Sequence, residues 1–71
     1  MSDHHTYKKI EIVGSSPNSS DDAIRNALTE CSKTVKNMDW YEVIENRGHI
    51  VNGNVAHFQV TLKVGFRIDN S

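Results

Sequence analysis

The sequence has one cysteine, almost no net charge and no long apolar run. A single cysteine cannot form an internal disulfide and lacks the paired spacing of common metal sites. Eight lysines and arginines against nine aspartates and glutamates leave a net charge of -1. This charge provides no general attraction to nucleic acid or to an anionic membrane. Because no run is apolar enough for a membrane span or a signal peptide, we expect a soluble cytoplasmic protein.

The chain is also short. Residues 1–71 are expected to form a single domain, and a domain of this size buries only about 60% of the surface that its unfolded chain exposes. Without a disulfide, self-association is the remaining way to add stability. The polar segment Met1–Thr6 is expected to be a flexible tail, and its His4-His5 pair is therefore not interpreted as a metal site.

Two long runs of strand-forming residues, Trp40–Val51 and Val55–Ile68, flank an Asn-Gly pair at residues 52 and 53. Both residues of this pair tolerate positive φ, so the pattern predicts a β-hairpin. In the second run every even position from residue 56 to residue 68 is apolar, which is typical of a half-buried strand. The odd positions predict a polar face that carries His57, Gln59, Thr61, Lys63 and Arg67.

The first of these runs does not alternate cleanly. The doublets Val43-Ile44 and Ile50-Val51 break the two-residue period, which indicates a bulge or a bend. Glycine is common at such irregularities, so we predict the bulge at Gly48.

A shorter strand over Tyr7–Gly14 and an amphipathic helix over Asp21–Met38 are predicted upstream. Ser19 or Ser20 is expected to cap the helix. The connector lacks the glycines of a phosphate-binding loop, so its serines are interpreted as capping residues. Cys31 lies in the apolar stripe and is interpreted as a buried structural thiol.

These elements give an α+β fold in the order β-α-β-β, with an antiparallel three-stranded sheet and the first strand beside the third. The helix would be about 27 Å long and a 14-residue strand about 46 Å, so the strands must curl around the helix or run past it. One helix can cover one sheet face, which leaves the face of Gln59 and Arg67 uncovered. Bare sheet edges favour pairing with other chains, and a closed assembly would satisfy them.

The residues that carry a family resemblance are Asp39-Trp40-Tyr41-Glu42-Val43, Arg47-Gly48-His49 and the run from His57 to Arg67. From Tyr7 to about Ile68 the chain resembles the dodecins, small flavin-binding proteins of bacteria and archaea. The resemblance implies a β-α-β-β protomer whose sheet wraps its helix. It also implies a hollow homododecamer with flavin pairs held between symmetry-related subunits.

The resemblance also assigns ligand roles, and the chemistry of the residues fits them. The family's tryptophan matches Trp40, which can stack on an isoalloxazine ring, and its glutamine matches Gln59, which can pair with the pyrimidine edge. Arg47 and Arg67 match arginines that can bind a phosphate, and His57 is a weaker ligand candidate. Without the resemblance, the tryptophan would be interpreted as core packing and the arginines as solvated strand charges.

We therefore predict a non-enzymatic flavin-binding protein that stores or sequesters FMN and quenches it, with riboflavin or FAD as other possible ligands. Catalytic and metal-binding residues are not predicted. A structural oligomer or a shell for nucleotide-like ligands such as coenzyme A is the alternative. A flavoenzyme is less favoured, because a ring stacked on tryptophan and on another flavin has no free face for a substrate.

Overall fold

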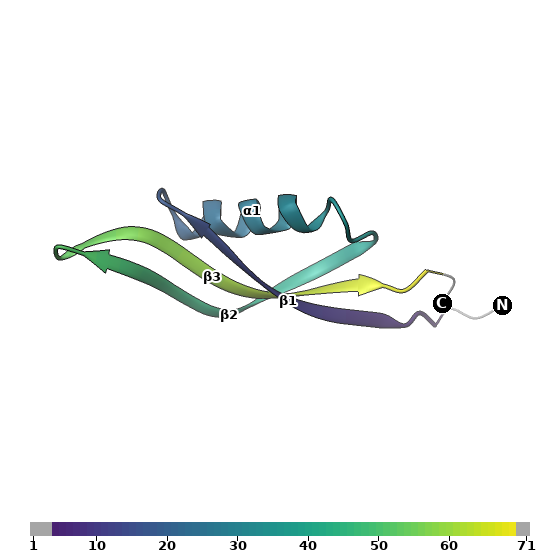
Figure 1. Cartoon of the computed structure of the whole chain (residues 1–71). Helices are drawn as coiled ribbons and strands as arrows, with labels where there is room; N and C mark the ends of the chain where they lie inside the picture. The colour runs from purple at the N-terminus through teal and green to yellow at the C-terminus, as the bar shows by residue number, and fades with distance from the viewer. Residues whose placement is uncertain (1–3, 70–71) are drawn as a thin grey trace.

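The computed structural model describes residues 4–69, and within them the chain forms four elements in the order β-α-β-β (Figure 1). These elements are β1 (Tyr7–Ser16), α1 (Ser20–Cys31), β2 (Met38–Val51) and β3 (Asn54–Arg67). All strand pairs are antiparallel and the sheet order is β1-β3-β2. The predicted α+β fold and the predicted pairing of the first strand with the third are confirmed. Residues 1–3 of the predicted tail lie outside the described part of the chain.

The first turn of α1 is capped as its sequence predicts. The Ser19 hydroxyl oxygen accepts a hydrogen bond from the backbone N–H of Asp22 at 3.0 Å, so Ser19 is the cap. The Ser16 hydroxyl donates to Oδ2 of Asp22 at 2.7 Å and ties the end of β1 to the helix. This bond holds the pKa of Asp22 below its ordinary value. Because Ser15 and Ser16 pair with β3, β1 is two residues longer than predicted.

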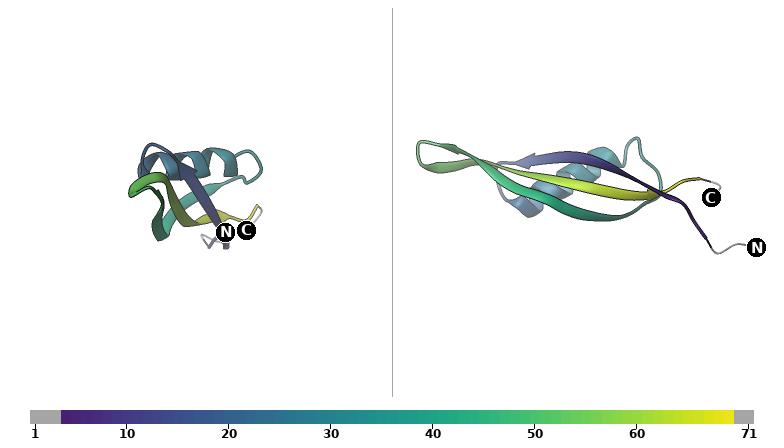
Figure 2. Two further views of the ribbon diagram at one scale, coloured as in Figure 1. Left: turned by 60° about the vertical axis from the view of Figure 1, so that its left-hand side comes forward. Right: turned by 90° about the horizontal axis from the view of Figure 1, so that it is seen from below.

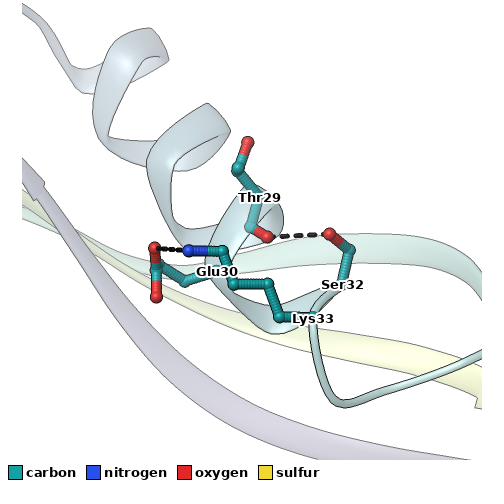
Figure 3. A network of polar contacts seen from close by, with 4 residues as sticks. All are labelled: Thr29, Glu30, Ser32 and Lys33. Carbon is teal, nitrogen blue, oxygen red and sulfur yellow. Dashed lines mark hydrogen bonds and ion pairs between the residues drawn. The ribbon is translucent and has the colours of Figure 1, made fainter.

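The helix ends at Cys31, so the predicted extension to Met38 is wrong. Polar side chains close this end of the helix (Figure 3). The Ser32 hydroxyl donates to the carbonyl of Thr29 at 2.7 Å, and Nζ of Lys33 pairs with Glu30 at 2.8 Å. A hydroxyl that satisfies a terminal carbonyl and a cation near the helix C-terminus both favour termination. In residues 4–69, no helix has the length and apolar character needed to cross a membrane.

Asn37 turns the chain from the helix layer into the sheet. Its φ of 65° is left-handed, its carbonyl accepts a hydrogen bond from the backbone N–H of Arg67 at 3.1 Å, and its Nδ2 donates to Asp69 at 2.6 Å. Met38 therefore lies opposite Phe66 as the first residue of β2. The apolar side chain of Met38 still packs on the core, which explains why it fits a helical pattern without belonging to the helix.

The core lies between α1 and the even positions of β3. Val60, Leu62 and Val64 are fully buried, and Ala23 and Ala27 cover them from the helix. Ile10, Ile12, Ile24, Leu28 and Met38 pack around this cluster. Cys31 is buried and unpaired, as predicted. Alternation along β3 thus identified the face that the helix covers.

Three register shifts bend the β2–β3 ribbon, and Gly48 is not at any of them. Residue 39 and Ile44 are the extra residues on β2, and Ala56 is the extra residue on β3. Gly48 pairs in register with Phe58, so the bulge predicted at Gly48 is wrong. Two of the shifts coincide with the apolar doublets at residues 43–44 and 50–51. The predicted turn is confirmed, because φ is 52° at Asn52 and 78° at Gly53.

The molecule is long, and much of β2 is uncovered. Its principal extents are 59 × 20 × 13 Å, and its radius of gyration is 14.9 Å. A compact chain of this length has a radius of gyration of about 11 Å. The end of the β2–β3 hairpin projects past α1, so the strands run past the helix (Figures 1 and 2). Large apolar side chains exposed on β2 are Trp40, Tyr41, Val43, Ile44, Ile50 and Val51.

Candidate functional site

The sheet face opposite α1 gathers all five residues that the sequence proposes as ligands. Residues directly opposite each other across an antiparallel pair share a face, so the pairing defines this surface, which we call the open face. Its side chains include Tyr7, Lys9, Glu11 and Ser15 from β1, Trp40, Glu42, Arg47 and His49 from β2, and His57, Gln59, Lys63, Gly65 and Arg67 from β3.

The bulge at Ile44 is what places Trp40 and Arg47 on one face. These two residues are seven positions apart, and a regular strand would direct them to opposite faces. The extra residue shifts the register by one, so Trp40 pairs with Gly65 and Arg47 pairs with Gln59 on the same side of the sheet.

Trp40 lies across its partner Gly65. A Cβ atom at residue 65 would collide with three atoms of the indole ring, so the ring occupies the space of the missing side chain. Gly65 is buried under the indole although it lies on the face without a helix. Trp40 remains 39% exposed and is available to a further partner.

Tyr7 supports the indole from the neighbouring edge strand. The two ring centroids are 5.3 Å apart with an interplanar angle of 62°, which is an edge-to-face contact. Arg67 lies opposite Tyr7, two residues beyond Gly65 on the same face. Sequence reasoning missed Tyr7 and Gly65 as parts of the site. The only available signal was a glycine inside a strand, which often marks close approach by another group.

An ion pair borders this aromatic group. Nζ of Lys9 contacts the carboxylate of Glu42, and both side chains are nearly half exposed. The hydrogen bond and the positive charge of Lys9, with a smaller contribution from the charge of Lys63, lower the pKa of Glu42. Lys63 lies between Glu11 and Glu42 in the pairing. Because the ion pair between Lys9 and Glu42 is exposed, it contributes little stability, but it holds charges of both signs beside the indole.

The other three predicted ligands lie further along the ribbon. Arg47 is directly opposite Gln59, with Ser15 on the other side of Gln59. In the next row toward the turn, His57 is directly opposite His49. Gln59 is partly buried, whereas Arg47 and both histidines are exposed. An amide with a cation beside it can bind a polar ring edge or an anion.

The aromatic residues around Trp40 and the polar residues around Gln59 lie far apart within one chain. Gln59 is six residues from Gly65 along β3, which corresponds to about 20 Å. The pocket beside Trp40 measures about 180 Å³, and its lining by Leu28 and Val64 places it toward the helix side. Ligand pockets usually measure about 300–1,000 Å³. Larger hollows of about 460 and 540 Å³ contain neither Trp40 nor Gln59.

A family model described as Dodecin matches residues 6–69. The curated Dodecin of Thermus thermophilus is 45% identical over 65 residues, which cover 92% of this chain and 94% of the relative. The structure of dodecin from Streptomyces coelicolor has a TM-score of 0.92 at 50% identity, covering 99% of this chain and 100% of that chain. Dodecin from Streptomyces davaonensis has a TM-score of 0.90 at 53% identity, covering 93% of this chain and 97% of that chain.

Proposed function

Because this chain belongs to the dodecin family, we propose that it binds flavin, with FMN as the preferred ligand, on the open face of a closed homododecamer. The observation that carries the proposal is the placement of Trp40. Its indole is held by Gly65 and Tyr7 yet keeps an exposed surface. A fixed, exposed aromatic ring is suited to stacking on a flat heterocycle, and such stacking contributes about 1–3 kcal/mol per ring.

The proposed flavin site is shared between protomers. An isoalloxazine ring is much shorter than the roughly 20 Å that separates the row of Gln59 from the row of Trp40 along one strand. A single ring cannot stack on Trp40 and pair with Gln59 of the same chain. We propose that Trp40 of one protomer and Gln59 of another contact the same flavin. Arg67, Arg47 and His57 would line the remaining edges, with the arginines closest to the phosphate.

The shape of the protomer supports an assembly. Apolar side chains such as Tyr41, Val43 and Ile50 are about half exposed or more on a strand that α1 does not cover. Exposed apolar strands that also form a sheet edge favour contact with another copy of the chain. Twelve subunits in a hollow shell is the arrangement that we propose. Sedimentation at micromolar concentration tests it, and a stable monomer under those conditions would contradict it.

The proposed role is storage and sequestration of free flavin, with quenching of its excited state by the stacked indole. A flavoenzyme would need space for a substrate beside the reactive ring and a positioned acid or base. A shell that holds another nucleotide-like ligand, such as coenzyme A, would use the arginines without needing the exposed indole. The arrangement of Trp40 therefore favours flavin over these alternatives.

Fluorescence titration tests the function directly. The purified protein is titrated into riboflavin, FMN and FAD, and quenching of flavin emission reports stacking on Trp40. We expect saturable quenching with FMN and little displacement by excess coenzyme A. Absence of quenching with all three flavins, together with binding of coenzyme A, would replace the flavin proposal with the nucleotide-shell alternative.

A further inference from the structure

His49 and His57 form a directly opposed pair near the hairpin end of the open face. A regular hairpin around the turn would place His49 opposite Ala56, and only the bulge at Ala56 brings His49 opposite His57. The pairing of β2 and β3 places them in one row. Both side chains are exposed. We propose that this cross-strand pair is a two-histidine binding site for a borderline divalent transition-metal ion, such as Cu²⁺, Ni²⁺ or Zn²⁺.

The geometry of a strand pair suits this role. Directly opposed residues have Cβ atoms about 4.5–5.5 Å apart. Two imidazoles that project from such positions can converge on one ion, whose bonds to histidine nitrogen are about 2.0–2.1 Å long for zinc. The pair lies just beyond the last residue of β3 that pairs with β1, and the pairing of β2 with β3 sets its spacing. On β3 the bulge residue next to His57 is Ala56, which has a small side chain.

The surrounding charges decide which ions fit. The row beside the histidine pair contains Arg47 and Gln59, and no carboxylate belongs to either row. Within residues 4–69, no group of three or more histidine, cysteine, aspartate or glutamate side chains is placed to hold a metal. Hard ions such as Ca²⁺ and Mg²⁺ need oxygen ligands and are disfavoured. Ions that bind imidazole strongly can use two histidines, with water or a further group completing the coordination.

This site shares His57 with the proposed flavin site but needs neither Trp40 nor a second protomer. His49 has no role in the flavin proposal, so it tests the metal site alone. The chain contains four histidines, and the other two are His4 and His5 near the N-terminus. An adjacent pair in the N-terminal segment could also bind copper, so the test must separate the two pairs.

The test uses the full chain with His4→Gln and His5→Gln as its reference protein, titrated with Cu²⁺ by calorimetry. We expect the reference protein to retain one high-affinity Cu²⁺ per chain. Adding His49→Gln or His57→Gln should weaken this binding by about 100-fold, because each change converts a chelating pair into a single ligand. Equal affinity in the reference protein and both sheet variants would overturn the proposal.

A second measurement does not depend on the stability of the sheet variants. Electron paramagnetic resonance of Cu²⁺ bound to the reference protein reports how many imidazole nitrogens coordinate the ion. Two coupled imidazoles support the pair, whereas one or none would overturn it. Flavin quenching is measured on the same samples. In the His49→Gln variant, whose substituted residue has no role in the flavin proposal, loss of copper binding with normal quenching identifies failure of the metal site, and the reverse identifies failure of the flavin site.

Discussion

The indole of Trp40 occupies the space that a side chain at Gly65, its cross-strand partner, would fill. Gly65→Ala should therefore displace the indole while leaving the core face of β3 unchanged. We expect FMN affinity to fall at least tenfold, which corresponds to about 1.4 kcal/mol and lies within the range of one stacking contact. Flavin quenching measures the loss.

Gly48→Ala is the matched control, since it adds the same methyl group to the same sheet away from the indole. Its nearest non-neighbouring atom would be the carbonyl oxygen of His57 at 3.2 Å, so a small adjustment is required. Normal flavin binding by Gly65→Ala, in a protein that still assembles, would show that the position of the indole does not matter for the ligand.

Mixing two inactive variants tests whether the site is shared. Trp40→Ala and Gln59→Ala homo-oligomers should each bind FMN weakly. Shells reassembled from equal amounts of both chains would recover about a quarter of the sites, because a random pair of subunits can supply one intact tryptophan and one intact glutamine. The recovered quenching amplitude measures this fraction. No recovery in mixed shells would place both residues of a site on one chain or exclude Gln59 from it.

Arg67 and Arg47 are expected to set the preference among flavins, since every flavin shares the same ring. FMN should bind about tenfold more tightly than riboflavin through a charge-assisted hydrogen bond to its phosphate. Arg67→Ala should remove most of this difference in affinity and leave the affinity for riboflavin nearly unchanged. Arg47→Ala tests the second arginine in the same way. Added salt should also reduce the difference in affinity between FMN and riboflavin. Equal losses for FMN and riboflavin would assign Arg67 to the subunit interface.

Asp22 should make stability dependent on acid pH. Its hydrogen bond from Ser16 lowers the pKa of the carboxyl below 3.8 in the folded chain. A carboxyl whose pKa is lowered by folding stabilises the fold at pH values above its pKa in the unfolded chain. This contribution disappears as the pH falls through the pKa of the folded chain. The stability difference between wild type and Asp22→Asn should therefore be present at neutral pH and vanish in strong acid. Urea unfolding at fixed protein concentration measures it.

Asp21→Asn is the control for this effect, because it removes the same charge from the same helical turn. The carboxylate of Asp21 is not the one that Ser16 contacts. If both variants lose stability with the same pH profile, the effect belongs to the charge at the helix N-terminus and not to the Ser16 hydrogen bond.

The features that sequence predicted well are governed by local rules. The turn at Asn52 and Gly53 needs two residues that tolerate positive φ, and the cap at Ser19 needs a short side chain with an oxygen atom. The helix end was predicted wrongly because Val35 and Met38 continue the helical spacing. Both side chains are only partly buried at the junction with the sheet, and the left-handed Asn37 is set by its contacts with Arg67 and Asp69.

For the candidate site, the sequence predicted the residues but not their spacing. Alternation alone places Gln59 and Arg67 on one face, whereas the position of Trp40 depends on which residue of β3 it pairs with. That register is a tertiary property, and it is altered by bulges that hydropathy does not locate. The tolerance of glycine for bulges favours Gly48, but the apolar doublet at Val43 and Ile44 is the better signal. The His49–His57 pair is invisible for the same reason.

The extra residue at Ile44 is one position between Trp40 and Arg47 that has no partner on β3. Replacing Ile44 preserves the count and therefore the face on which each later residue of β2 lies. Deleting it would remove the bulge and leave Trp40 and Arg47 six residues apart, so a regular strand would keep both on the open face and Arg47 opposite Gln59. During evolution of this chain, substitution or loss of the residue at position 44 should be accepted readily, whereas an inserted residue between Trp40 and Arg47 should be eliminated, because it would require a second bulge to keep Arg47 opposite Gln59.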